Sequence, residues 1–412
     1  MSMFRRGLPS PSAPHMHPSM EEETELGAPL SRVVEGNRLT LLTSGADRLK
    51  ALIELIEGAE HSLRILYYIV HADETGTRVR DALIAAARRG VTTSLLVDGF
   101  GSTNSPAFFR PLAESGIAFC RFSPKYGRRY LLRNHQKLAL ADEKRVLIGG
   151  FNVADEYFDP PEKDGWRDIG LLVEGESVAR AAAYYDDLFE WTRAPAGTAG
   201  DLRRILRAHS VTQGKLRWLF GGPSRRLSPW ARAVRRDLRS ARRLDLVSAY
   251  FAPTPAILRR IAGVARRRGG RARVVTAARS DVRSAVAAAR SLYWYMLKRG
   301  VEVYEHRASR MHTKLVLIDD VVHIGSANFD MRSLFLNLEM MLRIEDKEFA
   351  AGMRRFVERE IAASEHITLE SHDRDRTWLN RLRWAFGYFL LSVADFGITR
   401  RLNLDEVGLP PT

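Results

Sequence analysis

The sequence contains very little cysteine and no long apolar run. Its 412 residues include one cysteine, Cys120, which excludes an intramolecular disulfide framework and is typical of a reducing compartment. The first 36 residues hold no apolar core of a signal peptide. The most apolar stretch, residues 384–397, is interrupted by Asp395 and falls short of the ~20 residues that a spanning helix needs. We therefore expect neither a signal peptide nor a transmembrane helix.

Acidic residues are also in the minority. The chain has 64 lysines and arginines against 49 aspartates and glutamates, which gives a formal net charge of +15. Such a surplus attracts polyanions, so nucleic acid and anionic lipid both fit it, and so does a general role in solubility. A run of arginines at positions 232, 235, 236, 239, 242 and 243 could bind lipid phosphates or DNA, or could form a solvated helix face. Charge alone does not choose between these interpretations.

One pattern of residues occurs twice in the chain. A histidine, a lysine two positions later and an aspartate five positions after that occur at His135, Lys137 and Asp142, and 177 positions later (312 − 135) at His312, Lys314 and Asp319. Each copy is followed by two small residues and an asparagine, Gly149-Gly150 with Asn152 and Gly325-Ser326 with Asn328. A repeat this long indicates the tandem duplication of a whole domain. The economical arrangement is two similar domains across a pseudo-two-fold axis, with one joint site.

Helical and strand patterns alternate in the same order in the two halves. The sequence predicts helices at 47–57, 78–89, 107–115, 231–240, 256–268 and 282–299. It predicts strands at 63–70, 91–97, 117–122, 244–251, 272–276 and 301–305. This alternation is typical of the α/β class, with one sheet in each half.

The same patterns divide the chain into five segments. They are a flexible tail at 1–36, a first domain at 37–193, a linker at 194–228, a second domain at 229–370 and an apolar, basic segment at 371–412. The last segment either lies in a lipid interface or docks on the core as an apolar helix. The oligomeric state stays open.

Each histidine-lysine motif lies where alternating apolar residues predict a strand. Side chains two positions apart in a strand point to the same face, so the histidine and lysine of each motif share a surface. Asp142 and Asp319 lie an odd number of positions after their histidines and precede a second short strand, so we place them at hairpin turns in a structural role. The small residues that follow let a substrate approach the backbone, and Asn152 and Asn328 add uncharged donors. The combination predicts a phosphate-binding site.

These motifs resemble those of the phospholipase D superfamily, whose hallmark is two copies of His-x-Lys-x-x-x-x-Asp. The resemblance extends from about residue 36 onward, and the motif surroundings are similar to those of bacterial cardiolipin synthases. The similar segments are Arg133-Asn-His135-Gln-Lys137, Gly149-Gly-Phe-Asn152, Tyr157, Trp166-Arg-Asp168, Gly325-Ser-Ala-Asn-Phe-Asp-Met-Arg-Ser333 and Leu336-Asn-Leu-Glu339. Because no N-terminal transmembrane helices are expected, the chain is more like the short members of that branch.

The resemblance implies two phospholipase D-like α/β domains with one shared active site, and a phosphohistidine intermediate formed without metal or cofactor. It makes His135 the nucleophile and His312 the acid, although the pseudo-symmetry leaves the reverse assignment open. Each histidine also needs an orienting carboxylate on its other ring nitrogen. The resemblance gives this role to Asp168 and Glu339; for Asp168, the alternative is a salt bridge to Arg167. The predicted site comprises His135, Lys137, Asp142, His312, Lys314 and Asp319 as the catalytic motif, Asn152 and Asn328 as phosphate-binding residues, and Asp168 and Glu339 as supporting carboxylates.

The implied activity is that of a cardiolipin synthase, which joins two phosphatidylglycerol molecules and releases glycerol. A hydrolase of the same superfamily, acting on lipid or on nucleic acid, is the alternative. A binding protein with a vestigial site is disfavoured because both motifs are complete. The expected partners are phosphatidylglycerol, other anionic phospholipids and a membrane surface, without nucleic acid. The expected location is the cytoplasmic face of a bacterial inner membrane, as a peripheral protein.

Overall fold

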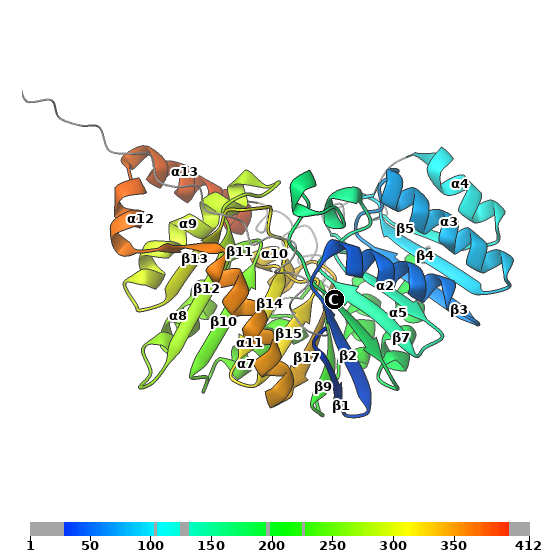
Figure 1. Cartoon of the computed structure of the whole chain (residues 1–412), viewed down its shortest axis with the longest axis horizontal. Coiled ribbons are helices and arrows are strands. Elements are labelled where there is room, and N and C mark those ends of the chain that lie inside the picture. The colour runs from blue at the N-terminus through cyan, green and yellow to red at the C-terminus, as the bar shows by residue number, and fades with distance from the viewer. Residues whose placement is uncertain (1–28, 103–104, 124–131, 195–197, 225–226, 395–412) are drawn as a thin grey trace, which may run out of the picture.

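The computed structural model describes residues 29–102, 105–123, 132–194, 198–224 and 227–394. Two α/β halves lie side by side, each built on an eight-stranded sheet with helices packed on it (Figure 1). Most of the predicted tail, residues 1–28, lies outside the described residues, but its last part contains the strand β1, Ser31–Val34.

The first half contains the sheet β1-β2-β8-β7-β6-β3-β4-β5. Its strands are β1, β2 (Asn37–Leu42), β3 (Ser62–Tyr67), β4 (Thr92–Asp98), β5 (Ala118–Phe122), β6 (Leu138–Ala141), β7 (Arg145–Gly149) and β8 (Gly170–Glu174). Its helices are α2 (Gly45–Glu57), α3 (Glu74–Arg88), α4 (Pro106–Glu114) and α5 (Val178–Arg193), with short 3₁₀ turns at Asp155–Tyr157 and Pro161–Lys163. The parallel strands β3, β4 and β5 are joined by helices, as the alternating pattern predicted.

The second half contains the sheet β18-β13-β12-β10-β14-β15-β17-β9. Its strands are β9 (Leu216–Gly221), β10 (Arg243–Ser248), β12 (Arg271–Ala277), β13 (Glu302–His306), β14 (Lys314–Ile318), β15 (Val321–Gly325), β17 (Glu339–Glu345) and β18 (Ser364–Ile367), and β11 (Phe251–Ala252) pairs separately with β16 (Phe329–Asp330). Its helices are α7 (Pro229–Asp237), α8 (Pro255–Ala265), α9 (Arg283–Leu297), α10 (Met331–Phe335), α11 (Lys347–Ala362), α12 (Leu369–Asp375) and α13 (Trp378–Phe389). Helix α6 (Ala199–His209) precedes β9, and a short π-helix, Leu390–Ala394, follows α13.

Seven strands occupy the same order in the two sheets. The order β2-β8-β7-β6-β3-β4-β5 in the first half corresponds to β9-β17-β15-β14-β10-β12-β13 in the second. This correspondence confirms the predicted fold class and the duplication. It also gives structure to the segment 194–228, which the sequence analysis treats as a linker: the segment contains α6 and β9, and β9 pairs antiparallel with β17 as β2 does with β8. The repeat in the structure therefore begins at β9, before residue 229.

Local signals set the helix boundaries. Ser44 accepts a hydrogen bond from the Asp47 N–H at the start of α2, and Thr254 does the same for Ile257 at the start of α8. Gly300 follows α9 with φ +78°, a left-handed conformation that ends a helix without a Cβ clash. Because such signals are local, the twelve predicted helices and strands agree with the observed bounds to within four residues.

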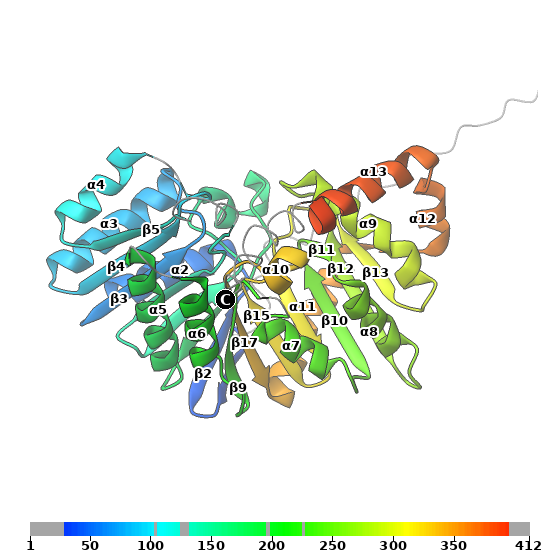
Figure 2. The ribbon, with the colours of Figure 1, turned by 180° about the vertical axis from the view of Figure 1, so that it is seen from behind.

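The two halves share a continuous hydrophobic core. One cluster of buried side chains joins β6, β7 and β8 of the first half to β14, β15 and β17 of the second, and includes residues of α5 and α11. A further cluster fills the outer part of each half. Figure 2 shows the same arrangement from behind, with α5 and α6 over the first sheet and α7 and α8 over the second. Apolar packing thus fixes one half against the other and holds the two motifs in register.

The C-terminal segment forms α12 and α13, and α13 packs along α9. Trp384 is buried and stacks on His372, while a Cβ at Gly387 would lie 2.7 Å from Cβ of Ala287, so the two helices are in close contact. The docked-helix alternative of the sequence analysis therefore holds for this face of α13. In the part of the chain that the structure describes, none of the helices has the length and apolarity required to cross a membrane.

Candidate active site

The two motif histidines lie at matching positions, shortly before β6 and β14, and the backbone ties each of them to the opposite half. His135 N–H donates to the Leu338 carbonyl at 2.9 Å, and His312 N–H donates to the Arg167 carbonyl at 2.7 Å. Both histidine side chains are buried. The predicted joint site between the halves is therefore present as a geometric arrangement.

This backbone pairing places the two supporting carboxylates crosswise. His135 Nδ1 lies 3.1 Å from both carboxylate oxygens of Glu339, and His312 Nδ1 lies 2.7 Å from Asp168 Oδ2. Each histidine thus meets a carboxylate from the opposite half, and Arg167 pairs with Glu360. Because a carboxylate only accepts hydrogen bonds, each Nδ1 carries the proton and each Nε2 keeps a lone pair.

Hydroxyl groups hold Glu339 in place. Its side chain is fully buried and accepts hydrogen bonds from Ser326 Oγ at 2.5 Å and Ser333 Oγ at 2.8 Å, in addition to His135. A buried carboxylate with several donors is fixed in orientation. Both serines belong to the segment 325–333, whose resemblance to the family did not by itself indicate this role.

Arg48 is a site residue that sequence reasoning missed. Its guanidinium is buried beneath the segment that joins β7 to β8. It donates to the Tyr157 carbonyl at 2.7 Å and also to the Asp168 carbonyl. Burial lowers the pKa of Arg48 to about 10, which leaves it charged at neutral pH. It therefore braces the backbone that carries Asp168. The available signal was an arginine among the apolar positions of the helix predicted at 47–57.

The two lysines occupy equivalent places. Lys137 Nζ donates to the His135 carbonyl at 2.6 Å, and Lys314 Nζ donates to the His312 carbonyl at 2.5 Å. Burial lowers the pKa of Lys314 to about 8 and moves that of Lys137 well below its usual value. A negatively charged group bound beside them would favour the protonated forms again. The two buried lysines therefore favour the binding of an anion in the site.

Burial also lowers the pKa of both histidines to about 4, and the neighbouring lysines act in the same direction. Glu339 and Asp168 oppose this lowering without cancelling it. For Asp168, burial raises the pKa, but the His312 hydrogen bond and the Lys314 charge outweigh burial and the pKa is lowered. At neutral pH the site without substrate therefore holds two neutral imidazoles and an ionised Asp168.

The small residues after β7 and β15 have different uses in the two halves. A Cβ at Gly150 would lie 2.7 Å from Asp168 Oδ2 and 3.0 Å from Lys314 Cδ, so the absent side chain makes room for the second histidine's partners. Ser326, at the matching position, donates to Glu339 instead. The functional pseudo-symmetry is therefore not exact in side chains.

The two asparagines are both buried. Asn152 Oδ1 accepts from the Ile69 N–H at 3.2 Å, and Asn328 Oδ1 has no hydrogen-bond partner among the described residues. An unpartnered buried polar atom in a cluster of this kind indicates room for a ligand or a water molecule.

The two motif aspartates stand apart from the histidines at hairpin turns, with φ +54° at Asp142 and +49° at Asp319. The Asp142 carboxylate accepts backbone N–H groups of residues 60, 61 and 62 at 2.8–3.0 Å, and Asp319 accepts those of residues 242 and 243. Both carboxylates thus fix the start of a neighbouring strand. This geometry agrees with the structural role expected from their odd spacing, although the superfamily motif counts them with the catalytic residues.

One trio among the described residues, His71, Asp73 and Glu156, has ligand atoms within 4.8 Å of one another, as a metal site would. Asp73, however, caps α3 by accepting from the Gly76 N–H at 2.8 Å and also accepts from the Asp155 N–H at 2.9 Å. The cluster is therefore explained by local capping.

Comparison with known proteins agrees with this geometry. The family described as "Cardiolipin synthase, PLD-like domain" matches residues 52–192 and 234–361, one segment in each half. The chain belongs to this family. Cardiolipin synthase 1 of Bacillus cereus is 31% identical over 352 residues, which cover 81% of this chain and 68% of the relative. Cardiolipin synthase of Geobacillus kaustophilus is 31% identical over 340 residues, covering 80% and 67%.

A solved structure extends the family likeness to the fold. The crystal structure of phosphatidylserine synthase from Haemophilus influenzae superimposes with a TM-score of 0.67 at 15% identity and covers 93% of this chain and 99% of that one. The predicted membership of the phospholipase D superfamily, in its cardiolipin synthase branch, is confirmed.

Proposed function

We propose that the chain is a cardiolipin synthase that converts two phosphatidylglycerol molecules into cardiolipin and glycerol through a phosphohistidine intermediate. The enzyme class, a phosphatidyltransferase of the phospholipase D superfamily, is confirmed by the family match and by the curated relatives. The observation that carries the chemical proposal is the pair of buried histidines, each held at Nδ1 by a carboxylate from the other half. That arrangement leaves two Nε2 atoms available in one site.

In the first step, His135 Nε2 attacks the phosphorus of one phosphatidylglycerol. A P–N bond forms, the bond from phosphorus to the terminal glycerol oxygen breaks, and His312, protonated once the anionic substrate is bound, donates its proton to the leaving oxygen. In the second step, His312 takes the proton of a hydroxyl group on another phosphatidylglycerol. That oxygen attacks phosphorus and the P–N bond breaks. Two in-line displacements predict net retention at phosphorus.

Lys137 and Lys314 are proposed to stabilise the negative charge on the phosphate oxygens in both transition states. Their Nζ atoms are already fixed by the histidine carbonyls, so little reorganisation accompanies the reaction. Asn152 and Asn328 are proposed to contact the phosphate oxygens as neutral groups. Asp168 and Glu339 are proposed to orient the imidazoles and to stabilise their protonated forms. Asp142 and Asp319 keep a structural role in this scheme.

We also propose that the protein binds the membrane surface peripherally, on the cytoplasmic face of the bacterial inner membrane, through the free face of α13. This face exposes a row of large apolar side chains, Trp378, Leu379, Leu382, Phe386, Phe389 and Leu390, between 38% and 68% accessible. Arg381 and Arg383 lie exposed beside them. Apolar side chains with adjacent basic residues suit an interface of anionic lipid.

Two assays test these proposals. Purified protein with labelled phosphatidylglycerol in mixed micelles is expected to give cardiolipin plus glycerol, and His135→Ala or His312→Ala is expected to abolish the product. Phosphatidic acid as the sole lipid product would indicate a hydrolase, and cleavage of DNA without lipid turnover would indicate a nuclease. Either result would contradict the proposed activity.

The membrane proposal is tested by flotation with phosphatidylglycerol vesicles. Replacing Trp378, Leu382 and Phe386 together by serine is expected to reduce the vesicle-bound fraction at least fivefold. Val33→Ser is the control, because Val33 is 54% exposed on the strand β1 and not on α13. Equal binding by the triple variant and the control would contradict the role of α13.

A further inference from the structure

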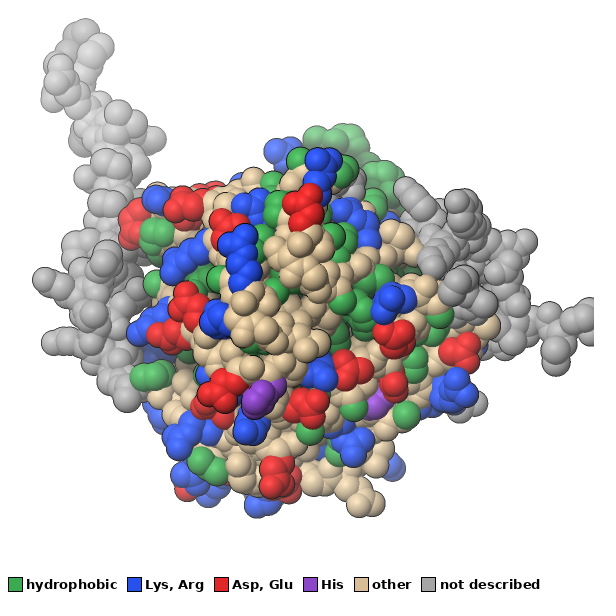
Figure 3. Space-filling model, turned by 90° about the vertical axis from the view of Figure 1, so that its right-hand side faces the viewer, with side chains coloured by type: hydrophobic (Ala, Val, Ile, Leu, Met, Phe, Trp, Pro, Cys, Tyr) green, Lys and Arg blue, Asp and Glu red, His purple; other side chains and the backbone are tan. Residues whose placement is uncertain are grey.

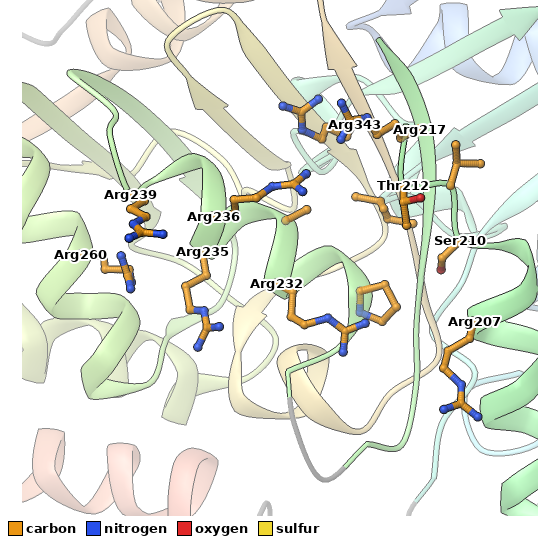
Figure 4. Close-up of a pocket in the computed structure, with 14 residues that line it drawn as sticks. Arg207, Ser210, Thr212, Arg217, Arg232, Arg235, Arg236, Arg239, Arg260 and Arg343 are labelled. Atoms are coloured by element: carbon orange, nitrogen blue, oxygen red, sulfur yellow. The ribbon is translucent and has the colours of Figure 1, made fainter. Parts of the chain in front are cut away.

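Eight arginines gather around one pocket of the protein. At the end of the molecule formed by the first half, basic and acidic side chains are intermixed (Figure 3). In contrast, a pocket of about 560 Å³ is lined by eight arginines, Arg207, Arg217, Arg232, Arg235, Arg236, Arg239, Arg260 and Arg343 (Figure 4). The pocket contains none of the histidines, lysines or carboxylates of the candidate active site.

Four of these arginines come from α7 and the turn after it. They are spaced three, one and three positions apart, as residues on one side of a helix are. Trp230, Ala231 and Val234 of the same helix are buried in the core of the second half. The helix is therefore amphipathic, with its basic side toward the pocket.

The remaining arginines come from other elements. Arg207 lies on α6, Arg217 on β9, Arg260 on α8 and Arg343 on β17, and Figure 4 shows their side chains around the same space. A solvated helix face, one of the alternatives in the sequence analysis, accounts for the arginines of α7 alone. It does not account for four additional arginines that reach the same pocket from four different elements.

Little of this charge is neutralised within the protein. Arg343 pairs with Asp237 at 2.8 Å and with Glu345 at 2.8 Å, and Glu345 also lies 3.8 Å from Arg217. By contrast, the side chains of four lining arginines make no hydrogen bond or ion pair with another described residue: Arg235, Arg236, Arg239 and Arg260.

The crowding has an electrostatic consequence at the pocket wall. The pKa of Arg217 is lowered, first by burial and then by the charges of Arg343 and Arg236. Like charges in a partly enclosed space repel each other more strongly than on an open surface, because less water screens them. A bound anion would relieve this repulsion.

We propose that the arginine pocket binds an anion that carries two or more phosphate groups. Guanidinium groups pair with phosphate oxygens in a bidentate manner, which suits arginine to this ligand class. A single phosphate would neutralise at most two of the four unpaired charges, and the volume is within the range of pockets that hold whole small molecules. The ligand is either a soluble polyphosphorylated compound or a lipid headgroup with two phosphates.

Isothermal titration of the full chain with tripolyphosphate at 0.1 M salt tests this proposal. The triple variant Arg235→Gln, Arg236→Gln, Arg239→Gln is expected to weaken binding at least tenfold. The matched control removes three exposed charges that do not line the pocket, Arg259→Gln, Arg266→Gln and Arg268→Gln, and is expected to change binding less than threefold. Absence of tripolyphosphate binding by the unaltered protein, or equal weakening in both triple variants, would overturn the proposal.

Three further measurements complete the test: phosphatidylglycerol turnover, melting temperature and competition by lipid vesicles. The pocket variant is expected to keep its phosphatidylglycerol turnover, and its melting temperature without ligand is expected to equal or exceed that of the unaltered protein because repulsion is reduced. A loss of binding then reflects the pocket and not misfolding. Competition of tripolyphosphate by cardiolipin vesicles, but not by phosphatidylcholine vesicles, would identify a lipid headgroup as the ligand, and lack of competition would identify a soluble one.

Discussion

Replacing Glu339 by glutamine tests the crossed arrangement of the site. Glutamine has the same shape, so the packing around this fully buried side chain is retained. The carboxylate, however, accepts hydrogen bonds from His135 Nδ1, Ser326 Oγ and Ser333 Oγ at once. The glutamine amide has an NH₂ group in place of one carboxylate oxygen, so a donor would face the donors that the carboxylate now accepts from. If its N–H faces His135, the imidazole must accept at Nδ1, and Nε2 then carries the proton and cannot attack phosphorus.

The expected magnitude follows from these contacts. A hydrogen bond to a charged group contributes about 1.5–3 kcal/mol, and a partial change of tautomer adds to this loss. We therefore expect the activation barrier to rise by about 2–4 kcal/mol, which corresponds to a fall in kcat of roughly 30- to 1,000-fold. Because the proposed mechanism assigns substrate binding to the lysines and not to Glu339, KM is expected to change by less than about threefold.

The assay is steady-state cardiolipin formation, with circular dichroism to verify folding. Asp237→Asn is the matched control, because Asp237 also accepts from a buried histidine, His323, at 2.9 Å, but lies outside the site. The control is expected to lose stability and to keep kcat within about threefold. A folded Glu339→Gln enzyme with kcat close to that of the unaltered protein would refute the assigned role of Glu339.

Three other predictions follow from the same geometry. Asp142→Asn weakens three backbone hydrogen bonds at a hairpin, so we expect the free energy of unfolding to fall by about 1–2 kcal/mol with kcat within threefold; a large loss of kcat in a stably folded variant would place Asp142 in the chemistry. Gly150→Ala puts a Cβ against the Asp168 carboxylate, so kcat is expected to fall at least tenfold, and an unchanged kcat would show that the carboxylate has room to move. Because the pKa of His312 is about 4 in the folded protein and about 6.5 when unfolded, the unfolded state binds more protons between these values, and stability is expected to decrease as pH falls from 6.5 to 4. Denaturant titrations at several pH values give the free energy of unfolding as a function of pH. Between pH 4 and 6.5 this free energy is expected to change less steeply in His312→Asn, by up to about 1.4 kcal/mol per pH unit, and an identical dependence in both proteins would contradict the low pKa.

The alternating helices and strands were predictable because their signals are local, and the duplication was predictable because the same motif occurs twice. Strand periodicity, helix caps and terminal glycines act within a few residues, and the hairpin position of Asp142 and Asp319 followed from an odd spacing. The two histidines and two lysines were likewise found by their repeated spacing.

The crossed carboxylates were not predictable in this way. Asp168 follows His135 in the chain, yet it contacts His312, because the packing of one half on the other decides which motif faces it. The strand β9 was missed for a related reason: its place beside β17 depends on a partner more than a hundred residues away. Arg48 was missed because its use depends on the Asp168 loop that covers it.

The central claim is that two histidines share one phosphoryl-transfer site, with His135 as nucleophile. The most direct measurement is to stop turnover of phosphatidylglycerol labelled at phosphorus with detergent at mildly alkaline pH, where a P–N bond survives, and then to map the labelled residue. The account predicts an acid-labile phosphatidyl adduct on His135 that is absent in His135→Asn; in His312→Asn, which lacks the acid of the first step, the adduct is expected to form more slowly but on the same residue. A labelled adduct on another residue, or turnover of phosphatidylglycerol by His135→Asn at an unchanged rate, would contradict it.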